Sequence, residues 1–360
     1  MSWLLAFVGF AILVILHELG HFAVAKAVGM RVEKFSLFFP PTLVSRKVGE
    51  TEYAIGAIPA GGYVKISGMN PDEELPEEVR DRAYHAQPVW KRIAVILAGP
   101  AVNLVLALLL LFVFWSAIGP ETVTDRVGTI EKGYPAAKVL EPGDRLVSVD
   151  GVRGEPRKLS ETIQEHRCPG RPTDGCRATE PATLVIERDG ERRTIEVAPV
   201  YDAAEGIEHT RVGFGYAAGP RDPLGPGDAL STAVEQFWFI TKQTVSLPAR
   251  IFDAEKRREI SGIVGSYEVT RQTILNDIAE VVLIMALVSL SLAIVNLFPF
   301  LPLDGGHIFW AIVEKVRGKP VPLRVMEQSG VVGFMLVIGL FLIGLSNDIG
   351  RLTGEGFTPP

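Results

Sequence analysis

The stretch WLLAFVGFAILVILHELGHFAVAKAV, residues 3–28, decides how this chain folds. It is long enough to cross a bilayer, because a helix needs about 20 apolar residues to span the hydrocarbon core. Near its C-terminal end it also carries His17, Glu18 and His21. Ionisable side chains at bilayer depth cost roughly 2.5 kcal/mol or more each when charged, and they usually have a function. The stretch therefore predicts a membrane-spanning helix that holds a functional site.

The motif HELGH, residues 17–21, has the spacing of a metal site. Residues i and i+4 of a helix lie on one face, so His17 and His21 can point a ring nitrogen at the same ion. Glu18 follows the first histidine directly, which suits a general base rather than a ligand. The alternative is a polar cluster satisfied by hydrogen bonds between helices, but it gives no shared reason for three ionisable residues so close together.

A third ligand is needed, because a catalytic zinc ion has three protein ligands and one open position. The best candidate is Asp304, in the segment NLFPFLPLDGGH at residues 296–307. Gly305 and Gly306 allow the backbone to approach a site closely, and the two prolines of the segment interrupt its helix. His307 is interpreted as a neighbour of the site, because a fourth protein ligand would close it.

Three further apolar stretches predict membrane spans at residues 93–118, 278–303 and 329–346, which makes about four spans with the first at 1–28. No basic segment precedes the first span and no small-residue cleavage site follows it, so we interpret it as retained rather than as a signal peptide. If each stretch crosses once, the first and third spans run in the same direction. The two histidines and Asp304 then face the same leaflet.

The segment between the second and third spans predicts a separate domain. Residues 125–200 alternate apolar and polar positions and contain Asp-Gly turns, which is typical of a compact β-rich domain. Residues 201–277 predict a linker with an amphipathic helix that lies on the membrane surface. Cys168 and Cys176 share one polar loop, and we favour a disulfide over two free thiols. A disulfide would place this domain outside the cytoplasm.

The two remaining loops are then predicted to lie on the cytoplasmic side. The loop at 304–328 is basic, in agreement with the positive-inside tendency. The loop at 29–92 contains YAIGAIPAGGYVKISGM, residues 53–69, whose apolar runs flank Gly61-Gly62 and predict a β-hairpin associated with the membrane. The net charge of −6, without a basic stripe, argues against nucleic acid as a partner.

On these motifs the sequence resembles the site-2 protease family of intramembrane zinc metalloproteases, and most closely its bacterial, PDZ-containing RseP-type branch. HELGH matches the family's HExxH motif. The other matching elements are Asn296, Pro299 and Asp304-Gly305-Gly306; Gly99, Pro100 and Asn103; GGYVKISGM after the first span; and PAAKVLEPGDRLVSVDGV of a circularly permuted PDZ domain. Pro302 lies one residue later than in many members, and Val139 stands where glycine is common in the PDZ segment.

The resemblance implies a multi-pass protein of the bacterial cytoplasmic membrane, with its active site toward the cytoplasm and a PDZ-like domain outside. It implies a Zn²⁺ ion held by His17, His21 and Asp304, with Glu18 as the catalytic residue. The implied substrates are single-pass membrane proteins such as anti-sigma factors, trimmed beforehand by an upstream site-1 protease. Asn296 is expected to bind substrate backbone or, equally, to cap carbonyls freed by Pro299.

A membrane-spanning substrate hides its backbone in internal hydrogen bonds, so it must unwind locally before it can be cleaved. An exposed strand edge can hold the unwound segment by β-addition. Within the 53–69 element we expect Gly61, Gly62, Tyr63 and Val64 to contact substrate. The alternative is a plain hairpin on the cytoplasmic side.

Two other functions are compatible with parts of the sequence. A metal sensor or transporter in the membrane would use the two histidines but would not need Glu18. A scaffold that works through its PDZ-like domain would hold a purely structural metal, which wants four protein ligands where the sequence offers three. A soluble protease is excluded by the position of HELGH inside an apolar span.

Overall fold

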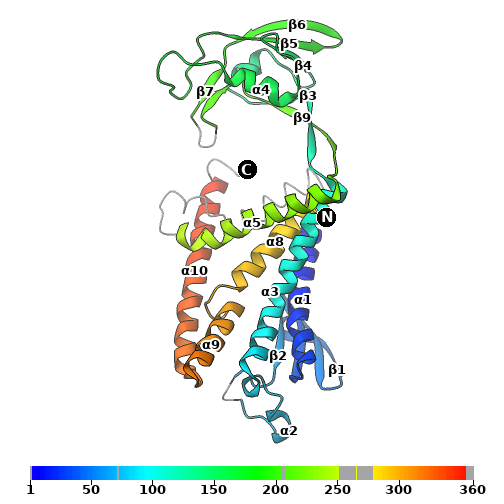
Figure 1. Cartoon of the computed structure of the whole chain (residues 1–360), viewed down its shortest axis with the longest axis vertical. Helices are drawn as coiled ribbons and strands as arrows, with labels where there is room; N and C mark the ends of the chain where they lie inside the picture. Colours follow the sequence, from blue (N-terminus) through cyan, green and yellow to red (C-terminus); the bar gives the residue numbers. More distant parts are fainter. Residues whose placement is uncertain (1, 71–72, 204–206, 251–264, 266–278, 354–360) are drawn as a thin grey trace. The chain divides into compact units, whose positions relative to one another are not determined.

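The apolar stretch that opens the chain forms one long helix, α1 (Ser2–Ala27), in the computed structural model of this protein (Figure 1). The structure describes residues 2–70, 73–203, 207–250, 265 and 279–353. The chain divides into two compact units, one made of residues 1–117 and 224–360 and the other of residues 118–223.

The first unit is mostly helical. After α1 come the short helices α2 (Glu77–Arg80) and η1 (Tyr84–Ala86), followed by α3 (Val89–Val113), which continues as the π-helical segment η2 (Phe114–Ile118). The later helices are α5 (Pro226–Arg250), α8 (Glu280–Asn296), α9 (Asp304–Arg317) and α10 (Leu323–Thr353).

Three of the described helices are long and apolar enough to cross a membrane, at Phe7–Ala27, Val89–Ile118 and Arg324–Arg351. This makes the chain a membrane protein, with one candidate span fewer than the four predicted. The stretch predicted at 278–303 contains α8, which is apolar but has only 17 residues. It ends at Asn296 because the proline-containing segment that follows cannot continue a helix.

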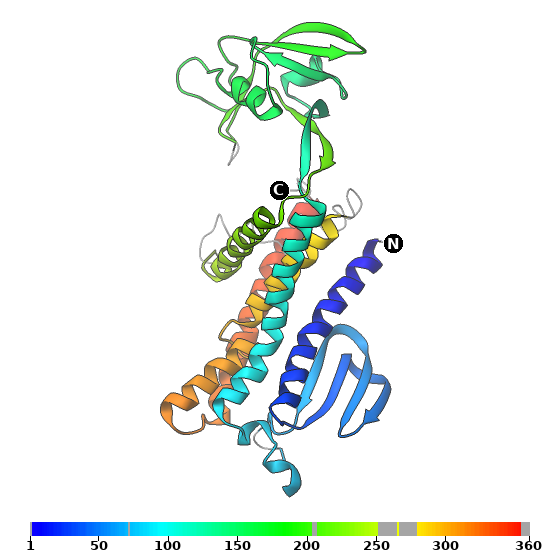
Figure 2. The same ribbon diagram turned by 45° about the vertical axis from the view of Figure 1, so that its right-hand side comes forward.

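Helix α3 lies at the centre of this unit and contacts α1, α5, α8 and α9 (Figure 2). Small residues permit the close approach to α1, since a Cβ atom at Gly20 would lie 2.7 Å from the carbonyl oxygen of Ala98. On the other side of α3, the buried hydroxyl of Ser289 in α8 donates to the carbonyl of Asn103 at 2.9 Å. Such contacts matter in a bilayer, where close packing and hydrogen bonds rather than hydrophobic burial hold helices together.

The loop after α1 folds into a small sheet of two long strands, β1 (Val32–Val48) and β2 (Thr51–Ile66), which pair antiparallel. Both strands bend, so Phe35 pairs with Tyr53 on one side and with Val64 on the other. The residues from 62 to 66 pair only with the first part of β1 among the described residues. They therefore form an edge of the sheet, on the side that contacts α1.

A charged cluster fixes this sheet at the end of α1. Glu50, in the turn between the two strands, accepts hydrogen bonds from both Arg82 and Lys26, at distances of 2.7–2.8 Å. These bonds, led by those from Arg82, hold the pKa of the Glu50 carboxyl down at about 2. The pairing is solvent-exposed, so its free energy is modest, but it joins three segments at one point.

The second unit is the inserted β-rich one. Its strands are β3 (Glu121–Ile130), β4 (Arg145–Val149), β5 (Ala182–Arg188), β6 (Glu191–Val197), β7 (Val200–Asp202), β8 (His209–Arg211) and β9 (Phe214–Arg221). Five of them form a sheet in the order β6-β5-β4-β3-β9, and β7 pairs with β8. Its helices are the short η3 (Pro135–Lys138) and α4 (Pro156–Gln164).

Local sequence explains the turns and the core of this unit. Both residues of the pair Asp189-Gly190, between β5 and β6, have positive φ, as a type I′ hairpin turn requires. Alternate strand residues then face one side and pack against α4, where Leu159 is fully buried with Leu184 and Ile186. The unit extends to residue 223, beyond the predicted end at 200. Three further strands continue it there.

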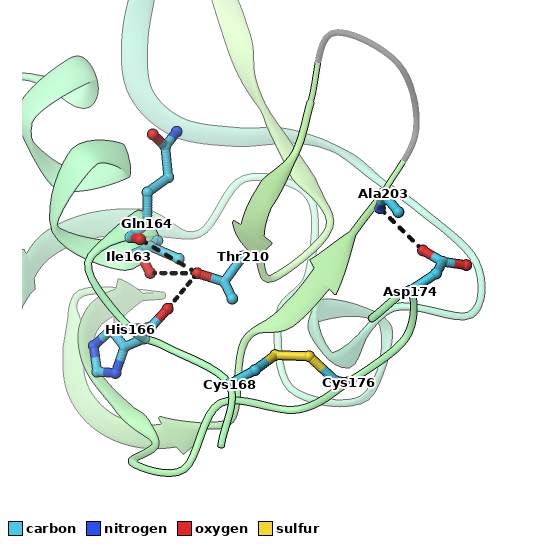
Figure 3. The surroundings of a disulfide bond; sticks show 8 residues. All are labelled: Ile163, Gln164, His166, Cys168, Asp174, Cys176, Ala203 and Thr210. Carbon is cyan, nitrogen blue, oxygen red and sulfur yellow. Dashed lines mark hydrogen bonds between the residues drawn. A yellow bond between two sulfur atoms is a disulfide. The ribbon is translucent and has the colours of Figure 1, made fainter. Parts of the chain in front are cut away.

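The predicted disulfide is confirmed: Cys168 and Cys176 are bonded (Figure 3). The adjoining loops are tied down by hydrogen bonds to main-chain groups. Thr210 donates to the carbonyl of His166 at 2.7 Å, and Asp174 accepts from the amide of Ala203 at 3.0 Å. The predicted amphipathic helix corresponds to α5, and most of the chain between α5 and residue 279 lies outside the described residues.

Replacement of Asp144 tests the electrostatics of the inserted unit. Arg188 donates to both oxygens of this buried carboxylate at 2.6 and 2.7 Å, which lowers its pKa below the ordinary 3.8. Asp144→Asn should destabilise the unit by about 2 kcal/mol at neutral pH. Because the folded-state pKa is lowered, this stabilisation is present above pH 3.8 and is lost as pH falls through the folded value.

The measurement is hydrogen exchange of the β5 amides in the full chain between pH 7 and pH 3. Wild type and variant should differ at neutral pH and converge in acid. A difference that stays constant over this range would rule out the Asp144–Arg188 pair as its source.

Candidate metal centre

Three predicted ligands, His17, His21 and Asp304, lie together in the first unit. The histidines lie one turn apart on α1, and Asp304 is the first residue of α9. Oδ2 of Asp304 lies 3.2 Å from Nε2 of His17 and 3.4 Å from Nε2 of His21. The two Nε2 atoms are 3.2 Å apart. No other group of three or more such side chains among the described residues is arranged to hold a metal ion.

These distances suit a tetrahedral ion. Two ligand atoms that are each about 2.0–2.2 Å from such an ion lie about 3.3–3.6 Å apart. The three measured separations are 3.2–3.4 Å. Both histidines are buried and Asp304 is nearly so. The group therefore has the size, the shape and the burial of a metal site.

The hydrogen bonds around the three side chains also call for a cation. Nδ1 of His21 lies 2.8 Å from the carbonyl oxygen of Val95, which can only accept, so Nδ1 carries the proton. In the neutral imidazole, Nε2 of His21 then keeps a lone pair. It faces the buried Oδ2 of Asp304, which has no hydrogen-bond partner. Two acceptors that face each other in a buried site repel unless a cation lies between them.

Glycines give the chain the room that this geometry needs. A Cβ atom at Gly99 in α3 would overlap the His21 ring, 2.6 Å from Cε1 and closer still to Nε2. A Cβ atom at Gly306 would lie 2.5 Å from the backbone nitrogen of Leu301, and one at Gly305 would overlap the carbonyl of Leu297. The segment after α8 thus folds tightly onto the first turn of α9, which places Asp304.

A partly buried ion pair joins the other end of α9 to α3. The guanidinium of Arg92 in α3 donates to both carboxylate oxygens of Glu314, at 2.6 and 3.0 Å. Paired, parallel bonds of this kind add orientation as well as energy. The pair joins the helix that supports the histidines to the helix that begins at Asp304. Sequence reasoning missed it, because nothing local links residues 222 positions apart.

A cleft of about 410 Å³ opens at the three side chains. Glu18 lines it, and a Cβ atom at Gly62 would lie 3.1 Å from Cγ of Glu18, so the sheet edge approaches α1 closely here. All of the site residues expected from the sequence line this cleft: His17, Glu18, His21, Gly61, Gly62, Tyr63, Val64, Asn296 and Asp304. His307 lies outside both the cleft lining and the three-residue group.

Two contacts of the histidines were not foreseen. The carbonyl of Val95 bonds to His21, and the amide group of Asn103 lies 3.3 Å from Nδ1 of His17. A main-chain carbonyl leaves no signal in the sequence. Asn103 did leave one, as a polar residue inside an apolar span, but the sequence alone assigned it no partner.

Comparison with known proteins gives a consistent result. The model described as Peptidase family M50 matches residues 5–340. A protein of Brucella suis named "Putative zinc metalloprotease" is 31% identical over 363 residues, which cover 94% of this chain and 92% of the relative. A protein of the same description from a Nostoc species is 29% identical, with 99% and 98% covered.

Among solved structures, the PDZ domain of an SdrC-like protein from Listeria monocytogenes aligns with 28% of this chain and with 94% of its own length. Its sequence identity is 14% and its TM-score is 0.21. A score this low assigns no fold to the inserted unit.

Substitution of Gly99 tests whether the His21 ring needs this space. Gly99→Ala should displace the ring from its bond to Val95 and weaken zinc retention about tenfold, as loss of a supporting contact does. Gly339→Ala is the matched control, because a Cβ atom there would have no neighbour within 4 Å. Zinc retained by the purified variants against a competing chelator is the measurement. Equal retention by both would show that the ring adapts to the added methyl group.

Proposed function

The chain belongs to peptidase family M50, a family of zinc metalloproteases, and on this premise we propose that it hydrolyses peptide bonds inside the membrane-spanning segments of other proteins. One observation carries the proposal: two imidazole nitrogens and a carboxylate oxygen converge beside a cleft, within and next to helices apolar enough to cross a membrane.

We propose that His17, His21 and Asp304 hold the zinc ion. Zinc in such a site supplies Lewis-acid activation of water and of the scissile carbonyl. Three protein ligands leave one position for these groups, as in catalytic rather than structural sites. The separations of 3.2–3.4 Å support this ligand set, and so do the unpartnered Oδ2 of Asp304 and the bond that fixes the proton on Nδ1 of His21.

Glu18 is the proposed general base. It follows a proposed ligand on the same helix and lines the same cleft, so it can accept a proton from the attacking water and pass it to the leaving amine. A metal sensor or transporter would have no use for a carboxylate at this position.

The proposed substrate-binding element is the sheet edge at residues 62–66. It pairs with β1 on one side only among the described residues, and it lies beside Glu18. An unwound substrate segment can add to this edge as a further strand, so that its backbone polar groups are satisfied while it is cut. Asn296, which also lines the cleft, is the proposed partner of a substrate backbone group.

The orientation in the membrane is part of the proposal. The disulfide in the inserted unit supports an extracytoplasmic position, and the opposite ends of the helices then lie at the cytoplasmic side. Helix α8 would be the fourth span. The inserted unit would act as a PDZ-like domain that binds or filters substrates. The substrates would be single-pass proteins, such as anti-sigma factors, already trimmed by another protease.

Replacement of Glu18 separates catalysis from metal binding. Glu18→Gln should retain zinc and lose at least a hundredfold in turnover, as loss of a general base does. The assay incubates each detergent-purified protein with a single-pass substrate whose outer domain has been removed, and maps the products by mass spectrometry. A cut by both proteins, or loss of zinc from the variant, would remove Glu18 from its proposed role. The absence of a cut by wild type would favour a metal sensor or a scaffold.

Replacement of Asn296 tests its contact with substrate. Asn296→Ala should keep the zinc content and the unfolding temperature of wild type but lower kcat/KM about three- to tenfold, the usual loss for one hydrogen bond. A lower unfolding temperature with unchanged kcat/KM would instead assign Asn296 to capping the end of α8.

A further inference from the structure

Asn103 is a fully buried polar residue in the middle of α3, next to the metal centre but not part of it. We propose that Asn103 is a positioning residue, whose side-chain amide holds the imidazole of His17 so that Nε2 points at the metal. This inference rests on the proposed zinc site. It adds a contact that determines how firmly the metal is held.

The two histidine rings have corresponding sets of contacts. In each ring Nε2 faces Asp304, while Nδ1 faces a polar group supplied by α3. For His21 that group is the carbonyl of Val95, at 2.8 Å, and for His17 it is the side-chain amide of Asn103, at 3.3 Å. One helix thus supports both rings, once with its main chain and once with a side chain.

The proton positions decide which atom of the amide is needed. A neutral imidazole that binds a metal through Nε2 carries its proton on Nδ1, so Nδ1 must find an acceptor. Asn103 turns its Nδ2 toward His17, and its Oδ1 is buried without a hydrogen-bond partner. A half-turn of the amide brings Oδ1 to His17. The amide group can therefore serve the ring in both proton arrangements, with Nδ2 donating to a bare Nδ1 and Oδ1 accepting from a protonated one.

The backbone that carries this side chain lies at a packed crossing of helices. Ser289 of α8 donates to the carbonyl oxygen of Asn103 at 2.9 Å, and both residues are fully buried. Ala107, one turn along α3, is also buried, against Leu290 of α8. Asn103 thus stands where α1, α3 and α8 meet, which is a rigid place from which to orient a ligand.

The competing explanation is that Asn103 only joins helices. A hydrogen bond between membrane helices adds modestly to stability, so such a role would lower the unfolding temperature and leave metal affinity unchanged. A positioning role predicts a loss of metal affinity, since removal of a partner of a ligating histidine typically weakens metal affinity 10–100-fold. Metal affinity and stability must therefore be measured on the same variants.

The experiment uses the full chain in detergent with three substitutions. Asn103→Leu keeps the branch at Cγ and replaces both polar atoms by methyl groups, and Asn103→Asp keeps an acceptor for Nδ1. Ser289→Ala is the matched control, because it removes a hydrogen bond at the same buried crossing without touching His17. For each protein the zinc dissociation constant is measured by chelator competition, the visible absorption is recorded after substitution with Co²⁺, and the unfolding temperature is determined.

We expect Asn103→Leu to raise the zinc dissociation constant 10–100-fold and to change the Co²⁺ spectrum, with Asn103→Asp and Ser289→Ala within about threefold of wild type. Wild-type affinity in Asn103→Leu would overturn the inference and leave the proposed zinc site intact. Equal weakening in Asn103→Leu and Ser289→Ala, or in both Asn103 variants, would also overturn it, because packing would then be the cause. Failure of wild type to bind zinc would instead refute the zinc site itself.

Discussion

The interaction on which the rest of the first unit depends is the meeting of His17, His21 and Asp304 inside a helical, apolar environment. Lone pairs that converge away from water are unfavourable by themselves, so the arrangement needs a cation and a scaffold that cannot relax. The surrounding structure supplies that scaffold. Residues of α3 contact both histidines, and glycines near the site allow the helices to approach closely.

Helix α3 makes most of the supporting contacts, although it contributes none of the candidate ligands. Its Val95 carbonyl fixes the tautomer of His21, and its Gly99 leaves space for the same ring. Its Arg92 pairs with Glu314 of α9, the helix that begins at Asp304. A helix packed between the two ligand-bearing elements is well placed for this, because it contacts both and spans the depth of the site. The geometry of the candidate metal centre therefore depends on contacts from α3 as well as on the three candidate ligands.

The sheet of β1 and β2 places an open strand edge beside the carboxylate of Glu18 in the cleft. The close approach between residue 62 and Glu18 is possible because that residue is glycine. The charged cluster at Glu50 joins the turn of the sheet to the end of α1. The proposed function uses this edge to hold an unwound peptide next to the candidate metal centre.

The sequence by itself determined the local features of this protein. The apolar stretch with HELGH, the end of α8 before its prolines and the Asp-Gly turn between β5 and β6 all follow from the preferences of neighbouring residues. The candidate ligands could be named for the same reason: a spacing of four residues places two of them on one helix face, and chemistry restricts the third.

Only the tertiary structure decided which distant groups support those ligands. The partners of His21 and His17 lie 74 and 86 residues away, and Arg92 and Glu314 are 222 residues apart. The bends that make residues 62–66 a sheet edge, and the strands that carry the inserted unit to residue 223, are equally non-local. Such contacts depend on how helices and strands pack in three dimensions, and packing is set by the whole chain at once rather than by any segment of it.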